Sequence, residues 1–167
     1  FSWTYSNCAF IALDPNELFP IGIPDSSGQL KWFQQQLASP TWTNADWHFI
    51  VLHQPPYSQG WAGYHGDEVI RNVIEPVIES HGIDFVIVGH THDYERLTKV
   101  YGKQQVTYLV VGGAGGTLEP EESSTLPQMD TVIKQHHIGR FYVDNKKIRF
   151  EVVDLNNKRI DSFSQKK

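Results

Sequence analysis

The chain has 167 residues, which is enough for one domain with its own hydrophobic core. Its hydrophobic content of 40%, with 13% aromatic residues, indicates a folded globule rather than a disordered chain. The net charge of −5, without a cluster of lysine and arginine, argues against a nucleic-acid-binding surface. A single cysteine excludes an internal disulfide, and no apolar run is long enough to span a membrane.

The N-terminal quarter of the chain predicts one strand, a loop and a helix. Residues 3–13 alternate loosely in polarity and predict a strand that buries Cys8. Prolines and a glycine over residues 15–24 predict a loop. Ser26 or Ser27 is placed to cap a helix whose apolar residues recur every three or four positions, until the next proline ends it. The tryptophans at positions 32, 42 and 47 are predicted to pack in the core or at a domain interface.

The next segment predicts a strand–helix–strand unit. Residues 47–53 and 83–88 are short apolar runs rich in β-branched residues, which is typical of buried strands. Residues 67–80 carry apolar side chains at helical spacing, and Pro76 predicts a kink or a division into two short helices. A crossover of this length joins parallel strands, so the two strands are predicted to be parallel neighbours.

Histidines follow both of these predicted strands. His53 closes the first run, and Gly89 separates the second from His90 and His92. Side chains two residues apart in extended chain point the same way, so His90 and His92 can face one small volume. Neutral imidazoles aimed at one point are common ligands of transition metals, and we predict that all three meet around one ion. Each histidine taken alone also fits an exposed or hydrogen-bonded side chain.

The remaining chain predicts antiparallel hairpins that complete the sheet. The strand-like segments are residues 97–101, 106–111, 141–143, 148–153 and 160–163. Residues 112–116 are rich in glycine, which could indicate a nucleotide-binding loop, but the motif of such a loop does not follow them. We therefore interpret these glycines as positions where the backbone passes close to a metal centre. Residues 117–135 predict a flexible polar loop. His136 and His137 are adjacent, so in a strand they would face opposite sides and serve one site poorly.

Two of these segments resemble known metal motifs. Residues 53–58 (His-Gln-Pro-Pro-Tyr-Ser) and 89–96 (Gly-His-Thr-His-Asp-Tyr-Glu-Arg) resemble the last two metal motifs of the calcineurin-like metallophosphoesterases. The Tyr-Glu-Arg ending is similar to the purple acid phosphatase branch, and the likeness extends to residues 5–14, 28–33 and 110–116. The resemblance implies an α/β fold, the α-β-β-α sandwich of mixed sheets, with residues 1–167 forming a single, partial domain.

The chain departs from the family pattern before His53. The family's early Asp, Gly-Asp and Gly-Asn-His motifs are missing there, and the only Gly-Asp pair, Gly66-Asp67, comes too late. The chain therefore resembles the C-terminal half of the domain, and we expect the missing N-terminal half to be its partner. That half would carry the carboxylates that bridge the two metal ions, so this chain alone is expected to be poorly active.

The resemblance implies hydrolysis of a phosphate ester with two divalent or trivalent ions, iron, zinc or manganese. His53 and His90 would bind the divalent ion, and His92 would bind the other one. In the loop over residues 54–66, His65, preceded by Tyr64, would contact the phosphate or protonate the leaving group. An exposed loop histidine without a function is the alternative for His65.

The other residues of the second motif have supporting roles in this interpretation. Asp93 is expected to act in a turn or beside the ligands, and Glu95 and Arg96 to brace the loop through ion pairs. The resemblance also favours a secreted or periplasmic location. Two other functions fit the histidines: a mononuclear zinc hydrolase, and a non-catalytic, β-rich binding module stabilised by metal.

Overall fold

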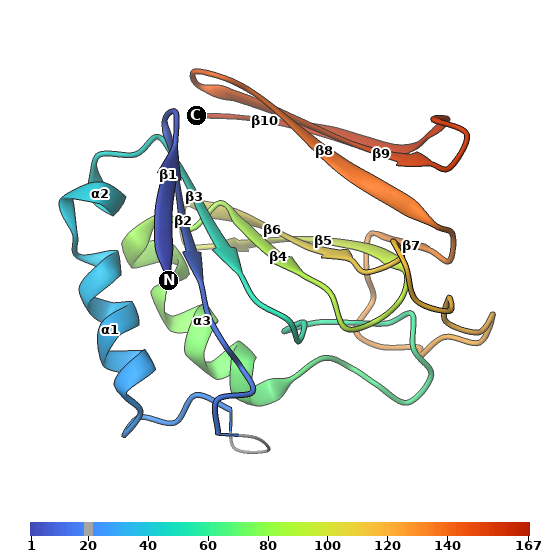
Figure 1. Cartoon of the computed structure of the whole chain (residues 1–167), viewed down its shortest axis with the longest axis horizontal. Helices are drawn as coiled ribbons and strands as arrows, with labels where there is room; N and C mark the ends of the chain where they lie inside the picture. Colours follow the sequence, from blue (N-terminus) through green and yellow to red (C-terminus); the bar gives the residue numbers. More distant parts are fainter. Residues whose placement is uncertain (19–21) are drawn as a thin grey trace.

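The computed structural model describes residues 1–18 and 22–167, so residues 19–21 of the predicted loop lie outside the described part. The described residues form three helices and ten strands, in this order along the chain (Figure 1): β1 Ser2–Tyr5, β2 Cys8–Ala12, α1 Gly28–Leu37, α2 Pro40–Thr43, β3 Trp47–Val51, α3 Glu68–His81, β4 Phe85–Val88, β5 Tyr94–Tyr101, β6 Gln104–Val111, β7 Thr131–Ile133, β8 His137–Asp144, β9 Lys147–Asp154 and β10 Arg159–Lys166. Among the described residues, no helix has the length and apolarity needed to cross a membrane.

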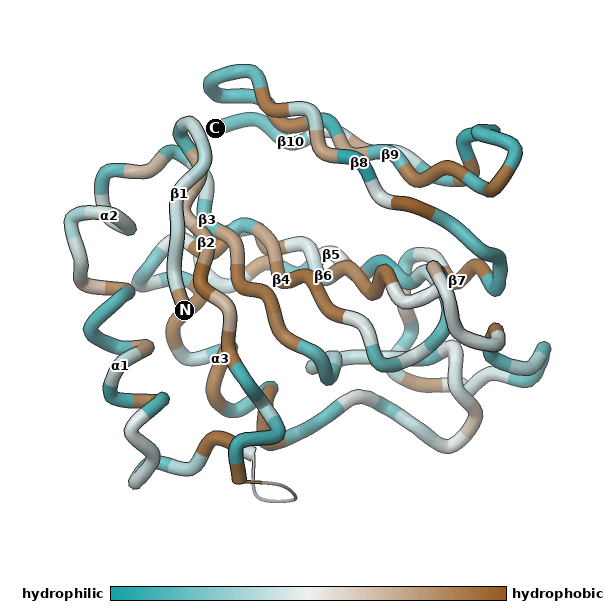
Figure 2. The backbone as a smooth tube through the Cα atoms, viewed as in Figure 1, coloured by the Kyte–Doolittle hydropathy of each residue, from teal (hydrophilic) through white to brown (hydrophobic). Residues whose placement is uncertain are grey.

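A mixed sheet of seven strands, in the order β1-β2-β3-β4-β6-β5-β7, forms the middle of the molecule. The strands β2, β3, β4 and β6 run parallel, and β3 pairs with β4 through Phe49 and Phe85. The predicted parallel neighbours are therefore confirmed. The three helices lie against one face of this sheet (Figure 1), and its central strand β4 is strongly hydrophobic (Figure 2).

A second sheet, β10-β9-β8, lies over the opposite face. The prediction that all the hairpins complete one sheet is therefore wrong for β8, β9 and β10, although β5 and β6 do complete the large sheet. The large sheet is apolar on both faces and needs a cover on each. Phe150 of β9 provides part of this cover and is fully buried between the two sheets. The fold class is mixed α/β with a mixed sheet.

The N-terminal strand prediction needs a correction. Residues 3–13 form a hairpin rather than one strand, because β1 turns back onto β2 through Ser6 and Asn7. Ser6 has φ 53°, the left-handed conformation that such tight turns require. Cys8 is 2% exposed, as predicted, and burial raises the pKa of its thiol to about 11. The thiol is therefore protonated, and inert as a nucleophile, at neutral pH.

The first two helices begin at side-chain caps. Ser27 caps α1 by accepting a hydrogen bond from the backbone of Leu30, as predicted. Pro40 follows the end of α1 and also begins α2, since proline fits the first turn of a helix. Trp42 and Trp47 are buried in the core, as the sequence predicts.

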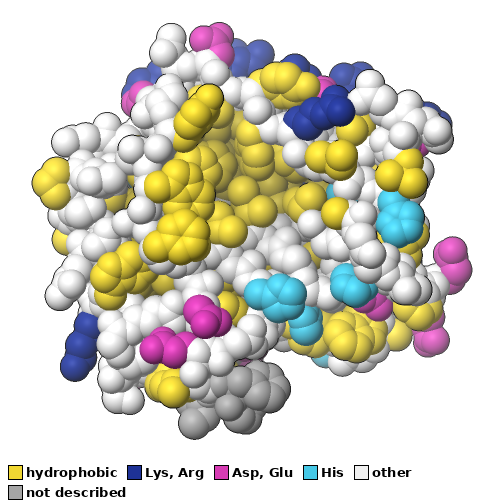
Figure 3. All heavy atoms as spheres, in the orientation of Figure 1, with side chains coloured by type: hydrophobic (Ala, Val, Ile, Leu, Met, Phe, Trp, Pro, Cys, Tyr) yellow, Lys and Arg dark blue, Asp and Glu magenta, His cyan; other side chains and the backbone are white. Residues whose placement is uncertain are grey.

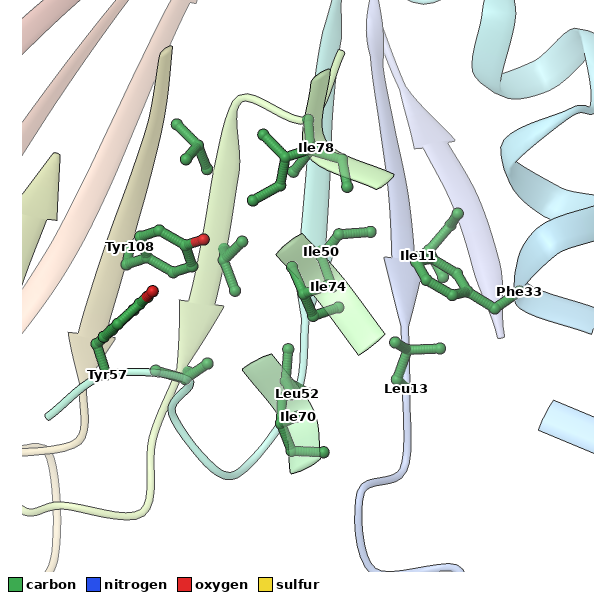
Figure 4. Close-up of a cluster of buried hydrophobic side chains, with 14 of the residues drawn as sticks. Ile11, Leu13, Phe33, Ile50, Leu52, Tyr57, Ile70, Ile74, Ile78 and Tyr108 are labelled. Carbon is green, nitrogen blue, oxygen red and sulfur yellow. The ribbon is translucent and has the colours of Figure 1, made fainter. Parts of the chain in front are cut away.

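Helix α3 runs unbroken through Pro76, so the predicted division into two short helices is wrong. Asp67 caps its start, and Gly82 ends it with φ 64°. The isoleucines at positions 70, 74 and 78 lie one turn apart and are fully buried. Figure 4 shows them pointing from the helix toward the strands, where Ile50 lies next to Ile74. This packing fixes the helix across the back of β3 and β4.

The face of the sheet that carries the second sheet is only partly covered. Phe1, Trp3, Phe10 and Phe49 stack in a continuous row, with ring centroids 5.2, 4.7 and 4.6 Å apart. Phe49 is buried, but Trp3 is 37% and Phe1 78% exposed. Figure 3 shows a hollow lined by hydrophobic side chains on this side, with histidine side chains gathered beside it. An apolar surface of this kind is typical of an interface.

Candidate metal centre

Parallel pairing of β3 with β4 brings their following loops together. Val51 pairs with Ile87, and beyond the strands the Gly89 amide donates to the His53 carbonyl at 3.0 Å. The loop over residues 54–66, called here the rim loop, begins after His53. The loop over residues 89–93, called here the histidine loop, contains His90 and His92. The carboxyl ends of parallel strands are the usual place for ligands in α/β sheets, and both loops lie there.

The imidazoles of His53 and His90 are in contact. His53 Nε2 and His90 Nδ1 are 3.3 Å apart, and the ring planes meet at 80°. Two nitrogens that bind one tetrahedral zinc ion at about 2.0–2.1 Å lie about 3.3–3.4 Å from each other. The nitrogen separation therefore fits two ligands of one ion. It also fits a hydrogen bond between the two rings, in which one nitrogen donates and the other accepts.

The backbone and surroundings of His90 suit a ligand. His90 has φ 71°, a conformation that is rare for residues other than glycine and that gathers at functional sites. Its pKa is lowered, first by burial and then by the neighbouring His53. A lowered pKa keeps the ring neutral at neutral pH, and only the neutral ring has a nitrogen lone pair for a metal.

His92 is held by residues that follow β6. Its Nδ1 donates to the carbonyl oxygen of Thr117 at 2.8 Å, and its backbone amide donates to Glu119 at 3.0 Å. The bond to Thr117 fixes the tautomer and leaves Nε2 with its lone pair, as is usual for metal-binding histidines. The structure thus brings together two of the three predicted imidazoles. Within residues 1–18 and 22–167, no three His, Cys, Asp or Glu side chains converge, so the prediction of three imidazoles around one ion is wrong.

Glycines after β6 allow the histidine loop to lie close to the neighbouring chain. A methyl group added to Gly112 would lie 1.9 Å from the carbonyl oxygen of Thr91, between the two histidines. One added to Gly116 would lie 2.4 Å from the ring of His92. The prediction that this glycine-rich segment passes close to the candidate centre is confirmed.

The rim loop places aromatic rings over His90. The ring of Tyr64 lies 5.4 Å and that of Trp61 5.8 Å from His90, and they lie 5.4 Å from each other. Burial raises the pKa of Tyr64, whose hydroxyl has no hydrogen-bond partner among the described residues. His65 is exposed, and its Nδ1 donates to the carbonyl of Leu126. Sequence reasoning missed Trp61, although it lies in a loop that begins at a predicted ligand.

Asp93 lies beneath the rim loop. It is fully buried, and neither carboxyl oxygen has a hydrogen-bond partner among the described residues. Burial, and then the charge of Glu95, raise the pKa of Asp93 to about 7. A methyl group added to Gly60 would lie 1.5 Å from this carboxyl, so the rim loop packs directly on it. Asp93 thus lies beside the centre rather than in it, in agreement with the sequence interpretation.

The two charged residues after Tyr94 have different roles. Arg96 pairs with Asp161 at 2.9 Å and with Asp130 at 3.5 Å, which confirms its predicted bracing role. Glu95 forms no ion pair with the described residues, so its predicted ion pairing is wrong, and hydrogen bonds take the place of that pairing. Its side chain points to the other face of β5, where it is fully buried and accepts hydrogen bonds from Ser58 and Gln59.

Other histidines bind backbone or nearby side chains instead of a common centre. Both ring nitrogens of His48 lie 2.9 Å from carbonyl oxygens at the end of α3 and in α2. His81 contacts the neighbouring Ser80. His136 and His137 donate to the carbonyls of Gly113 and Gln135, respectively, and do not form a ligand pair.

Comparisons with known proteins identify the family of this chain. The family model described as calcineurin-like phosphoesterase matches residues 7–94. The chain is 31% identical over 93 residues to purple acid phosphatase 21 of Arabidopsis thaliana, covering 53% of this chain and 21% of that protein. It is 29% identical over 104 residues to the Fe(3+)-Zn(2+) purple acid phosphatase 12 of the same plant, covering 62% of this chain and 21% of that protein. The chain thus spans about a fifth of these relatives.

Solved structures share the fold. The purple acid phosphatase PPD1 from yellow lupin (Lupinus luteus) seeds matches 99% of this chain with a TM-score of 0.84 and 18% identity, over 32% of its own chain. The family match covers both strands that carry the histidines and the helix between them. This chain belongs to the calcineurin-like phosphoesterase family and is similar to its purple acid phosphatase branch.

Proposed function

We propose that this chain carries the C-terminal half of a two-metal centre that hydrolyses phosphate esters. The observation that supports this most directly is the 3.3 Å contact between His53 Nε2 and His90 Nδ1 at the ends of adjacent parallel strands. The nitrogens are spaced as two ligands of one ion, in a chain whose relatives include an iron–zinc phosphatase. His92, oriented separately by Thr117, is assigned to the second ion.

The donor atoms suit the metals that the resemblance implies. Imidazole nitrogens bind zinc, iron and manganese, and His53 and His90 offer theirs from a fixed scaffold. A bound pair of such ions would activate water as the nucleophile and neutralise charge on the phosphoryl oxygens. Tyr64 lies against His90, and His65 follows it on the rim loop; both would contact the phosphate, and His65 would protonate the leaving oxygen. We place the protein outside the cytoplasm, secreted or periplasmic, as the family resemblance favours.

The bridging carboxylates are proposed to come from a partner segment, the N-terminal half of the same domain. Asp93 and Glu95 are the carboxylates within three residues of His92, and both are buried under the rim loop. The apolar row that ends in the exposed Trp3 and Phe1 supports a partner on this face, because an open sheet face needs a cover. The hollow beside it adjoins the gathered histidines, so a segment that fills it would reach the centre (Figure 3).

Metal removal tests the proposed function. We expect the protein from the complete reading frame around residues 1–167 to hydrolyse p-nitrophenyl phosphate and to bind about two ions per domain. A chelator should lower this rate by on the order of a thousandfold, and added zinc or iron should restore it, because the ions supply several kcal/mol of transition-state stabilisation. Turnover that survives complete metal removal would refute the proposal.

A non-catalytic module stabilised by metal is the second candidate, favoured by the meeting of only two imidazoles among the described residues. Metal stoichiometry separates the two functions. The enzyme requires two ions for each complete domain, whereas a binding module would hold one or none and show no chelator-sensitive turnover.

A further inference from the structure

Glu95 joins the two loops that form the candidate centre. Its carboxylate is fully buried at the start of β5 and accepts hydrogen bonds from three donors. The Ser58 hydroxyl donates at 2.6 Å, the Gln59 amide at 2.6 Å and the Thr91 hydroxyl at 3.3 Å. Ser58 and Gln59 belong to the rim loop, and Thr91 lies between His90 and His92. One carboxylate therefore fixes the rim loop against the histidine loop.

The bonds of Gln59 extend this connection to the aromatic end of the rim loop. The Gln59 side chain accepts from the Met129 amide at 2.9 Å and donates to the Ser124 carbonyl at 3.1 Å. The Ser124 hydroxyl in turn accepts from the Gly63 amide at 2.9 Å and donates to the Trp61 carbonyl at 3.0 Å. A series of hydrogen bonds thus runs from Glu95 to the residues beside Tyr64 and His65.

A buried carboxylate without a basic partner is costly, and an apolar side chain of similar volume would pack here at lower cost. Glu95 instead fixes the positions of its hydrogen-bond donors, because charge-assisted hydrogen bonds are short and constrain the groups that donate them. The neighbouring Arg96 differs from Glu95, because its ion-pair partners Asp130 and Asp161 lie outside the two loops of the candidate centre. The three donors of Glu95 all come from the two loops of the candidate centre.

We infer that Glu95 is a positioning residue that holds the rim loop and the histidine loop in one geometry. The use of this geometry in binding an ion and a phosphate ester rests on the proposed function. Ordering one loop then orders the other, so the state of the histidines and the position of Tyr64 and His65 are coupled through Glu95.

Amide hydrogen exchange of the metal-free chain tests this inference. Glu95→Leu removes every acceptor at similar volume, and Glu95→Gln keeps one acceptor oxygen. In Glu95→Leu we expect exchange of the Gln59 and Gly63 amides to rise by about tenfold or more, with a smaller rise in Glu95→Gln. Exchange in β9 should be unchanged. The matched control is Glu151→Gln on β9, whose carboxylate binds Tyr142 and should not affect the rim loop.

Unchanged exchange at Gln59, or an equal rise in β9 and the rim loop, would overturn the positioning role. If Glu95→Leu fails to fold, Ser58→Ala removes a single donor and should raise exchange in the same two loops only. Calorimetric titration with zinc gives a second measurement. Zinc binding should weaken by about 10–100-fold in Glu95→Leu and recover in part in Glu95→Gln. No zinc binding by the unaltered chain would refute the proposed function, while the exchange data would still decide the role of Glu95.

Discussion

Replacing Gly112 with alanine is expected to disrupt the histidine loop and to destabilise the fold. The added methyl group would lie 1.9 Å from the carbonyl oxygen of Thr91, a backbone atom that cannot rotate away. Thr91 connects His90 to His92, so its displacement moves both imidazoles. We expect the free energy of unfolding to fall by about 3 kcal/mol, measured by urea denaturation, and zinc affinity to fall with it.

The same glycine-rich segment provides the control. Gly115 has no atom within 4 Å of an added methyl group and has no left-handed φ, so Gly115→Ala should be tolerated. Equal stability and equal zinc affinity in the Gly112 and Gly115 variants would show that the close approach to Thr91 is not needed.

Replacing His90 with alanine is expected to abolish metal-dependent turnover of the complete domain. His90 touches His53 through a ring nitrogen, and its left-handed backbone is held in place by the loop around it. Loss of one ligand removes several kcal/mol of transition-state stabilisation, so the rate with p-nitrophenyl phosphate should fall on the order of a thousandfold.

His81→Ala is the matched control, because His81 ends α3 and contacts Ser80 rather than the other histidines. It should keep both turnover and zinc content. A His90→Ala protein that retains its turnover would contradict the assignment of His90 as a ligand, provided that the variant unfolds at the same urea concentration as the parent protein.

Hydrophobic patterns predicted the part of the fold that carries the candidate centre. The apolar runs at 47–53 and 83–88 became β3 and β4, and the 3–4 spacing between them became α3. The parallel pairing followed from the crossover, and it brought His53 next to His90. These features are local or follow from chain length, so the sequence alone was enough to predict them.

The predictions that the structure contradicts concern contacts that no local sequence pattern indicates. The hairpin at Ser6 depends on a left-handed turn by a residue that is not glycine. The imidazole of His92 turns toward Thr117, which is distant in sequence. Glu95 was expected to pair with a cation, but alternation along β5 directs it into the rim loop, opposite to Arg96. Such side chains are placed by segments that meet only in the folded chain.

The most direct test is an anomalous diffraction map, collected at the zinc absorption edge, from crystals of this chain grown with zinc. We expect a peak within bonding distance of both His53 Nε2 and His90 Nδ1, since these nitrogens lie 3.3 Å apart. A map without a peak there, or with zinc bound only to other histidines, would contradict it.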